Sequence, residues 1–290
     1  CITMRPQKMR SKIFLDGGDA AETRAVIERL GFLDGQTTNP TLIAKNPAAQ
    51  ARLVSGEKFT EQEIYAFYKD VVAEMSALLP DGSISIEVYA DANTPSEKMY
   101  AQSKNMYQWI PHAHIKFPIT RAGLEAAERG IADGMRVNMT LCFSQQQAAA
   151  VHSATRGTTK GQVFISPFVG RLDDIGENGM DLIKNIIRMY REGDSSVEVL
   201  TASVRSLEHF LYALALRSDI ITAPAHILYA WADAGLPVPE SDFVFEATNL
   251  SPIPYQNLSL DGDWRECDIT HPLTDKGIER FAGDWNALIV

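Results

Sequence analysis

The chain has few cysteines and no long apolar run. Its 290 residues include three cysteines, Cys1, Cys142 and Cys267, without a C-x-x-C pair, which is too few for a disulfide framework at this length. No stretch reaches the roughly 18 apolar residues of a membrane span, and the first residues lack the apolar core of a signal peptide. We therefore expect a soluble, cytoplasmic chain with no membrane partner.

Basic residues are also scarce. Lysine and arginine number 27 against 37 aspartates and glutamates, so the formal net charge is −10. Nucleic-acid binding draws most of its affinity from clustered basic side chains. This composition excludes nucleic acid as the expected partner, and any phosphate bound here should be small and locally held.

What the sequence does contain is a regular alternation of β-like and helical segments from about residue 11 to about residue 235. Such alternation is typical of a parallel sheet covered by helices. The eight expected strands are Ile13–Gly17, Gln36–Asn39, Ile84–Tyr89, His114–Phe117, Val137–Cys142, Val163–Ser166, Val197–Ser203 and Ile220–Ala223. No low-complexity linker divides them, so we expect one domain over residues 1–290.

The helical segments show the 3.6-residue period of amphipathic helices. In residues 61–79, Ile64, Val71 and Met75 fall on one face, which predicts a helix packed against the sheet. Ser206 is expected to cap the helix that follows it, and Gly193 to end another.

Residues 236–272 are rich in Pro, Asp and Asn and predict an extended arm, followed by a last helix over 274–289. Eight β/α units fit a closed barrel better than a doubly wound open sheet. The predicted fold is therefore α/β, a single (α/β)₈ TIM barrel over about residues 11–235 with a C-terminal arm and a closing helix.

Side chains alternate between the two faces of a strand, so one parity of each strand faces the barrel interior. Ile84, Ile86 and Val88 share one parity, which turns Glu87 inward. The same reasoning turns further polar residues inward: Asp16, Lys116, Asn138, Thr140, Ser166, Ser203 and Arg205. They lie late in their strands, and the active sites of such barrels lie at the carboxyl ends of the strands.

Simpler readings of these residues stay open. Taken singly, each fits a hydrogen-bonded polar residue at a strand end, although so many on one interior favour a site. The pair His112 and His114 fits a metallohydrolase barrel, but it lies before Lys116, toward the bottom of the strand. We therefore expect no metal site.

Several motifs, in chain order, resemble the transaldolase family, including its small fructose-6-phosphate-aldolase-like branch. They are FLDG (14–17), DGQTTNPTL (34–42), SIEV (85–88), HIKFPIT (114–120), VNMTL (137–141), SPFVGRLDD (166–174) and TASVR (201–205). The segment LTDKGIERFA (273–282) also resembles the closing helix of the family. The arm at 236–272 departs from the family in length and composition.

The resemblance implies a role for each matching residue. Lys116 corresponds to the Schiff-base lysine, Asp16 to the general acid/base, and Glu87 with Thr140 to the pair that binds the catalytic water. The remaining matches correspond to contacts with the dihydroxyacetone unit, Asn39, Asn138 and Ser166, and to the phosphate grip, Arg171, Ser203 and Arg205. A second interpretation of Arg171 stays open, in which Asp173 and Asp174 bind its side chain and the turn is only structural. No cofactor is implied.

The family resemblance implies a transaldolase of the non-oxidative pentose phosphate pathway. Such an enzyme moves a dihydroxyacetone unit from a ketose phosphate (sedoheptulose 7-phosphate or fructose 6-phosphate) to an aldose phosphate. Its partners would be small sugar phosphates. Whether the chain forms a homo-oligomer is left open by the sequence. The rivals are a fructose-6-phosphate aldolase or related sugar aldolase, and a non-catalytic sugar-phosphate-binding barrel. Phe168 favours transfer, since the aldolase branch resembles Ser/Ala-Pro-Tyr there and phenylalanine has no hydroxyl to protonate an intermediate.

Overall fold

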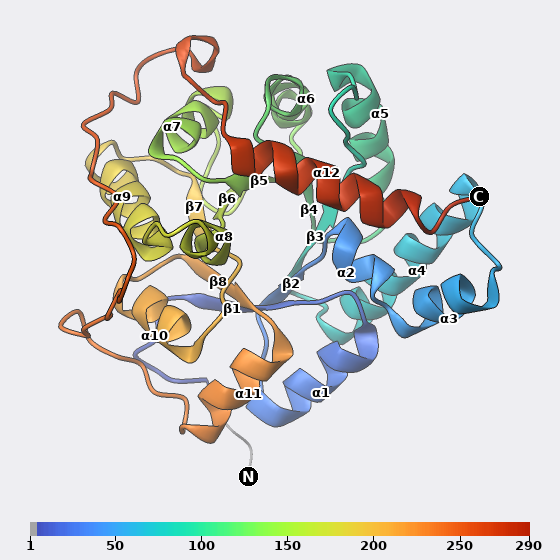
Figure 1. Ribbon diagram of the computed structural model, residues 1–290, viewed down its shortest axis with the longest axis horizontal. Coiled ribbons are helices and arrows are strands. Elements are labelled where there is room, and N and C mark those ends of the chain that lie inside the picture. The colour runs from blue at the N-terminus through green and yellow to red at the C-terminus, as the bar shows by residue number, and fades with distance from the viewer. Residues whose placement is uncertain (1–4) are drawn as a thin grey trace.

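A computed structural model describes residues 5–290 (Figure 1), so Cys1 lies outside the described residues. Eight parallel strands close into a barrel in chain order, and the last strand pairs with the first. The strands are β1 (Lys12–Asp16), β2 (Gly35–Thr37), β3 (Ser83–Glu87), β4 (Ala113–Pro118), β5 (Val137–Cys142), β6 (Val163–Pro167), β7 (Glu198–Thr201) and β8 (Ile220–Ala223). The predicted TIM barrel and its eight strands are confirmed.

Two strand ends differ from the prediction at the mouth of the barrel. β7 ends at Thr201 because Ser203 adopts a φ of 55°, in the left-handed region that a strand cannot use. Phe168 lies just beyond β6, at the N-cap of a short helix, and forms an isolated bridge with Ala202. Ser203 and Phe168 therefore lie in mouth loops, where strand parity does not set their direction.

Helices cover the outside of the barrel, and further helices lie in the loops at its mouth (Figure 1). They are α1 (Ala20–Leu30), α2 (Pro40–Ala44), α3 (Pro47–Ser55), α4 (Glu61–Leu78), α5 (Ser96–Tyr107), α6 (Arg121–Ala132), α7 (Gln145–Ala154), α8 (Val169–Asp174), α9 (Gly179–Glu192), α10 (Leu207–Ala215), α11 (Ala225–Asp233) and α12 (Pro272–Asn286). No helix among residues 5–290 is long and apolar enough to cross a membrane.

The ends of these helices follow from local chemistry. Ser206 caps α10 as expected, since its hydroxyl accepts a hydrogen bond from the amide of His209. Gly193 follows α9 as expected, but with a φ of −93° it does not need the freedom of glycine. A Cβ there would lie 2.4 Å from Leu260 Cδ1. The Leu260 side chain of the C-terminal arm therefore packs directly against this glycine, and a larger residue there would have to displace it.

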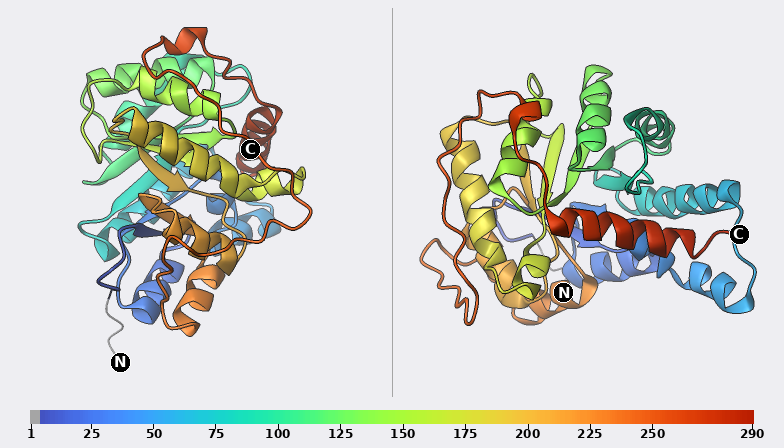
Figure 2. Two further views of the ribbon diagram at one scale, coloured as in Figure 1. Left: turned by 90° about the vertical axis from the view of Figure 1, so that its left-hand side faces the viewer. Right: turned by 45° about the horizontal axis from the view of Figure 1, so that its top comes forward.

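The arm, residues 236–271, carries no strand and only one short 3₁₀ helix, η1 (Trp264–Glu266). It runs past α10, α9 and α7 along the outside of the barrel before α12 crosses the mouth (Figures 1 and 2). Gln145 exchanges two hydrogen bonds with the backbone of Gln256, at 2.6 and 2.9 Å. Trp264 is 1% exposed. The arm is therefore fixed to the barrel, and the predicted closing helix begins two residues early, at Pro272.

Candidate active site

A cavity of about 250 Å³ lies at the mouth of the barrel. Most of the residues that the sequence nominated line it: Asp16, Asn39, Lys116, Ser166, Phe168, Arg171, Ser203 and Arg205. Glu87, Asn138 and Thr140 do not line this cavity and are buried in the barrel, at no more than 6% exposure. The barrel thus brings nominated residues from most of its strands to one end.

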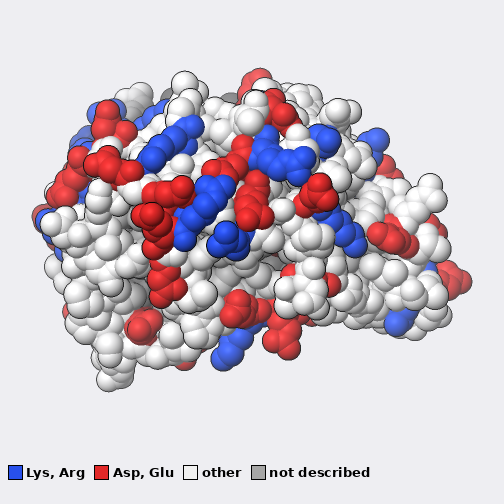
Figure 3. Space-filling view, turned by 90° about the horizontal axis from the view of Figure 1, so that it is seen from above, with Lys and Arg blue, Asp and Glu red and all other residues white. Residues whose placement is uncertain are grey.

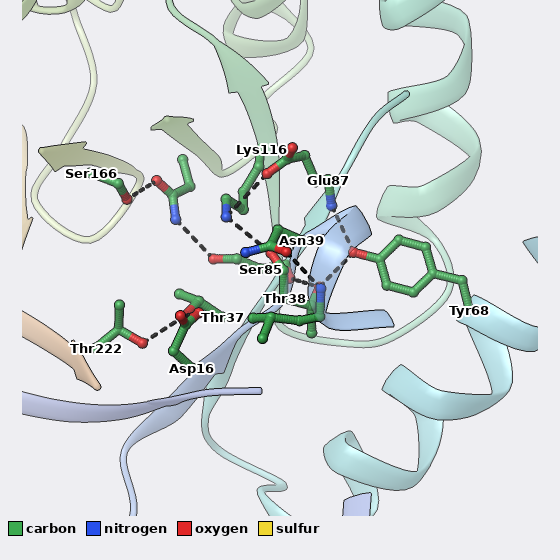
Figure 4. A network of polar contacts seen from close by, with 12 residues as sticks. Asp16, Thr37, Thr38, Asn39, Tyr68, Ser85, Glu87, Lys116, Ser166 and Thr222 are labelled. Carbon is green, nitrogen blue, oxygen red and sulfur yellow. Dashed lines mark hydrogen bonds and ion pairs between the residues drawn. The ribbon is translucent and has the colours of Figure 1, made fainter. Parts of the chain in front are cut away.

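Lys116 lies on β4 with its amino group buried inside the barrel (Figure 4). Its Nζ donates a hydrogen bond to the backbone carbonyl of Thr38 at 2.9 Å and lies 3.1 Å from Glu87 Oε1. The two side chains are 4% and 6% exposed. An amine so shielded meets little water, which suits attack on a carbonyl group.

The carboxyl groups of Asp16 and Glu87 are both affected by burial. Desolvation raises the pKa of each above its ordinary value, and the Lys116 ammonium lowers it by a smaller amount. Glu87 also feels the negative charge of Asp16, which raises its pKa further. Carboxyl groups with raised pKa values accept and donate protons nearer neutral pH.

A chain of hydroxyl groups fixes the Asp16 carboxylate. Thr37 Oγ1 donates to Asp16 Oδ1 at 2.8 Å and lies 2.6 Å from Thr222 Oγ1 on β8. Because the proton of Thr37 is directed at the carboxylate, Thr222 must be the donor to Thr37. The hydrogen bond from Thr37 lowers the pKa of Asp16, against the larger effect of burial.

A second hydrogen-bonded network links β6, β5 and β3. Ser166 Oγ donates to Asn138 Oδ1 at 2.7 Å, and Asn138 Nδ2 donates to Ser85 Oγ at 3.0 Å. These bonds orient the Asn138 amide. Thr140 Oγ1 is buried without a hydrogen-bond partner among residues 5–290, and such an atom is one that a bound water commonly satisfies.

Tyr68 supports this site from α4, outside the barrel (Figure 4). Its hydroxyl accepts a hydrogen bond from the Glu87 amide at 3.0 Å and contacts Thr38 Oγ1. It thereby joins β3, which carries Glu87, to the segment of Thr38, whose carbonyl accepts the hydrogen bond from Lys116. Tyr68 is buried on the same helix as Ile64, Val71 and Met75, but no local pattern in the sequence shows where its hydroxyl reaches.

The arginines at the mouth differ in their partners. Arg205 forms a two-bond ion pair with Asp174, at 2.6 and 2.8 Å. Gly170 permits this approach, because a Cβ there would lie 2.5 Å from Arg205 Cγ. Asp173 accepts from His209 Nε2 at 2.8 Å. The acids of this turn therefore form their side-chain hydrogen bonds with Arg205 and His209.

The cavity is also lined by residues that sequence reasoning did not nominate for it, among them Lys45, Arg280 and Phe281. Lys45 follows α2, three residues after the motif that contains Asn39. Arg280 and Phe281 lie on α12. Their only local signal was the resemblance of 273–282 to the closing helix of a family, which says nothing about direction.

His114 lies at the bottom of β4, away from the cavity. Its Nδ1 lies 2.7 Å from Ser83 Oγ and its Nε2 lies 2.9 Å from the carbonyl oxygen of Gly161. Its ring stacks on Phe164, while His112 is exposed. Within residues 5–290, no group of three or more His, Cys, Asp or Glu side chains is arranged to hold a metal ion.

Comparisons with known proteins show the family of the chain. Residues 13–289 match the family Transaldolase/Fructose-6-phosphate aldolase. A probable transaldolase of Dehalococcoides mccartyi is 33% identical over 277 residues, covering 96% of this chain and 99% of that protein. A probable transaldolase of Caulobacter sp. (strain K31) is 35% identical over 274 residues, covering 94% and 96%. The chain belongs to the transaldolase/fructose-6-phosphate aldolase family.

Proposed function

We propose that this protein is a transaldolase that carries a dihydroxyacetone unit as a Schiff base on Lys116. Family membership implies sugar-phosphate substrates. The observation that carries the proposal is the buried Lys116 amino group, 3.1 Å from a Glu87 carboxylate oxygen and lining the same cavity as Asp16. Such a transfer belongs to the non-oxidative pentose phosphate pathway, which is cytoplasmic.

The first stage forms the covalent bond. The neutral Lys116 amine attacks the C2 carbonyl of the ketose phosphate, and the carbinolamine then loses its hydroxyl as water, leaving an iminium. Glu87 is the group nearest to the amine that can give and take these protons. Thr140, whose hydroxyl is buried without a protein partner among the described residues, supports a water shared with Glu87.

Cleavage and transfer follow at Asp16. Its carboxylate removes the proton of the C4 hydroxyl, the C3–C4 bond breaks, and its electron pair moves to the iminium to give an enamine. The aldose phosphate leaves, and a second aldose phosphate accepts the C3 carbon of the enamine. Asp16 returns its proton to the new alkoxide, so the carboxyl acts first as base and then as acid.

The remaining nominated residues are proposed to hold the substrate. Asn39 Oδ1 accepts from the amide of Leu42 and caps α2, which leaves its Nδ2 group for a hydroxyl of the dihydroxyacetone unit. Asn138 and Ser166 are proposed to contact the same unit. Arg171, Ser203 and Arg205 are proposed to bind the phosphate, because a guanidinium makes paired, charge-assisted hydrogen bonds to phosphate oxygens.

Borohydride reduction of the wild-type enzyme with fructose 6-phosphate or sedoheptulose 7-phosphate tests the proposal. We expect a stable adduct on the peptide that contains Lys116, read by mass spectrometry. Lys116→Arg should abolish the adduct and keep the fold, because a guanidinium stays protonated and forms no imine. Lys160→Arg, at an exposed lysine at the far end of the barrel, is the matched control and should keep the adduct. An adduct that persists in Lys116→Arg would refute the assignment.

A further inference from the structure

We propose that the Tyr68 hydroxyl is a positioning group for the Lys116 amine. It accepts the hydrogen bond of the Glu87 amide and thereby leaves the Thr38 carbonyl free to hold that amine. This inference rests on the proposed function, in which Lys116 attacks the ketose. Tyr68 lies on α4, outside the barrel, and does not line the mouth cavity, so it acts through the backbone rather than on the substrate.

The ladder of hydrogen bonds between β2 and β3 changes partners beside Lys116 (Figure 4). The Thr38 amide donates to the Ser85 carbonyl at 3.2 Å. In a parallel ladder, a residue that donates in this way accepts in turn from the amide two positions further along the neighbouring strand, which here is Glu87. The Glu87 amide donates instead to the Tyr68 hydroxyl at 3.0 Å, and the Thr38 carbonyl accepts from Lys116 Nζ at 2.9 Å. The hydroxyl thus replaces a backbone carbonyl as the acceptor for one buried amide.

The direction of each proton in this network follows from its neighbours. Thr38 Oγ1 donates to the Ser85 carbonyl at 2.6 Å, so the Tyr68 hydroxyl must be the donor to Thr38 Oγ1. Burial raises the pKa of Tyr68 well above its ordinary value, so the phenol keeps the proton that this bond needs. The tyrosine hydroxyl therefore accepts from one strand and donates to the segment after the other, in a single arrangement.

Packing fixes the phenol ring that carries this hydroxyl. Tyr68 is fully buried, and its ring meets Trp109 and Trp285 edge-on, with centroids 5.8 and 5.7 Å apart. Lys116 Nζ is in turn held between the Thr38 carbonyl and Glu87 Oε1, at 2.9 and 3.1 Å. The amine is therefore aligned before a ketose arrives, and such alignment lowers the barrier to attack on a bound carbonyl group.

Tyr68→Phe tests the inference, because phenylalanine keeps the packed ring and removes only the hydroxyl. The Glu87 amide should then turn to the Thr38 carbonyl and compete with Lys116. We expect kcat for transfer from fructose 6-phosphate to fall about tenfold with KM unchanged, because the amine loses its alignment while the sugar keeps its contacts. Tyr190→Phe is the matched control, since that buried hydroxyl donates to the Ala148 carbonyl at 2.8 Å and lies outside the mouth cavity. It should keep kcat.

Thr38→Val is a second variant that tests the same network. It keeps the Thr38 carbonyl and removes the acceptor of the Tyr68 proton, so kcat should fall about threefold with KM unchanged. The double variant Tyr68→Phe/Thr38→Val should lose no more than Tyr68→Phe, because both changes break one network. Losses that multiply in the double variant, or an unchanged kcat in Thr38→Val, would overturn the proposed role of Tyr68.

A crystal structure of the full-length Tyr68→Phe variant separates this inference from the proposed function, because it requires no ketose. We expect the Glu87 amide to donate to the Thr38 carbonyl and Lys116 Nζ to have left that carbonyl. A wild type that forms no borohydride adduct, together with this rearrangement in the variant, would overturn the Schiff-base proposal and support the role of Tyr68. A Lys116 Nζ that stays bonded to the Thr38 carbonyl, or equal kcat losses in Tyr68→Phe and Tyr190→Phe, would overturn that role.

Discussion

Phe168 forms part of the cavity wall. In the proposed function, this residue decides between transfer of the dihydroxyacetone unit and simple cleavage. Its side chain is 8% exposed, lines the cavity and packs against Phe143 with ring centroids 5.6 Å apart. An enamine on Lys116 either waits for an acceptor aldehyde or is protonated and hydrolysed to free dihydroxyacetone. An apolar ring offers no hydroxyl to orient a water for that protonation.

We therefore expect Phe168→Tyr to increase the release of free dihydroxyacetone from fructose 6-phosphate, by about tenfold if the hydroxyl acts as a general acid or orders a water. The transfer reaction, assayed with erythrose 4-phosphate as acceptor, should change less. Phe168→Leu removes the ring without adding a hydroxyl and should not increase release. A wild type that releases dihydroxyacetone as fast as it transfers it would contradict the transaldolase proposal and favour the aldolase.

Thr222 is expected to act as a positioning residue through Thr37. Thr222→Val keeps the shape and removes the donor that directs the Thr37 proton to Asp16. We expect kcat to fall about fivefold, the value of one hydrogen bond, with KM for the donor sugar unchanged. Without Thr222 the Thr37 hydroxyl is less firmly directed at Asp16, which weakens a hydrogen bond that lowers the pKa of Asp16, so the acid limb of the kcat profile should move to higher pH.

Thr155→Val serves as the control for Thr222→Val, because it removes another buried hydroxyl, at the end of α7 and outside the cavity, that donates to the Val151 carbonyl. It should leave the pH profile in place. An unchanged acid limb in Thr222→Val, with kcat reduced, would mean that Thr222 contributes only to packing.

At the scale of elements, β4 carries two buried basic groups with different tasks. Lys116 faces the mouth cavity, and His114, two residues earlier, faces the bottom of the barrel. Desolvation lowers the pKa of His114 to about 3, so the folded protein holds this imidazole neutral. The strand thus places Lys116 toward the mouth and a hydrogen-bonded histidine toward the bottom of the barrel.

His114 should make the free energy of unfolding depend on pH in the acid range. In the unfolded chain its pKa is near 6.5, so between pH 6.5 and about 3 the unfolded state binds a proton that the folded state does not. The stabilising contribution is present above pH 6.5 and is lost as the pH falls. His114→Gln should reduce the pH dependence of the unfolding free energy in this range by up to about 1.4 kcal/mol per pH unit.

Urea unfolding followed by circular dichroism from pH 4 to pH 8 measures this slope. His112→Gln, at the exposed histidine two residues earlier, should keep the slope of the wild type. If His114→Gln keeps it as well, the acid sensitivity of the fold arises elsewhere.

Across the whole molecule, the C-terminal segment closes the structure that the barrel begins. The arm passes over one side of the barrel and returns α12 to the mouth, where α12 lies beside α2 (Figures 1 and 2). The bond between Thr41 and Asp284 joins positions 243 residues apart. On the face shown in Figure 3, basic and acidic side chains are interspersed and form no continuous basic surface.

The alternation of side chains along a strand explains which site residues could be predicted from the sequence. The period-2 alternation of a strand is a property of its own backbone, and it turned Glu87, Lys116 and Asn138 inward before any partner was known. The same rule does not apply at Ser203, because a left-handed φ ends β7 after Thr201, although Ser203 still lines the cavity. Strand parity holds only while the backbone remains extended.

The sequence by itself therefore determined the barrel, the order of its strands and the family to which the chain belongs, since these depend on short-range periodicity and contiguous motifs. Only the tertiary structure decided which side chains meet. Thr37 contacts Thr222 across 185 residues, Asp174 engages Arg205 rather than Arg171, and α12 brings Arg280 to the cavity. These contacts depend on barrel closure and on the path of the arm, which are set by packing between distant segments rather than by any local pattern.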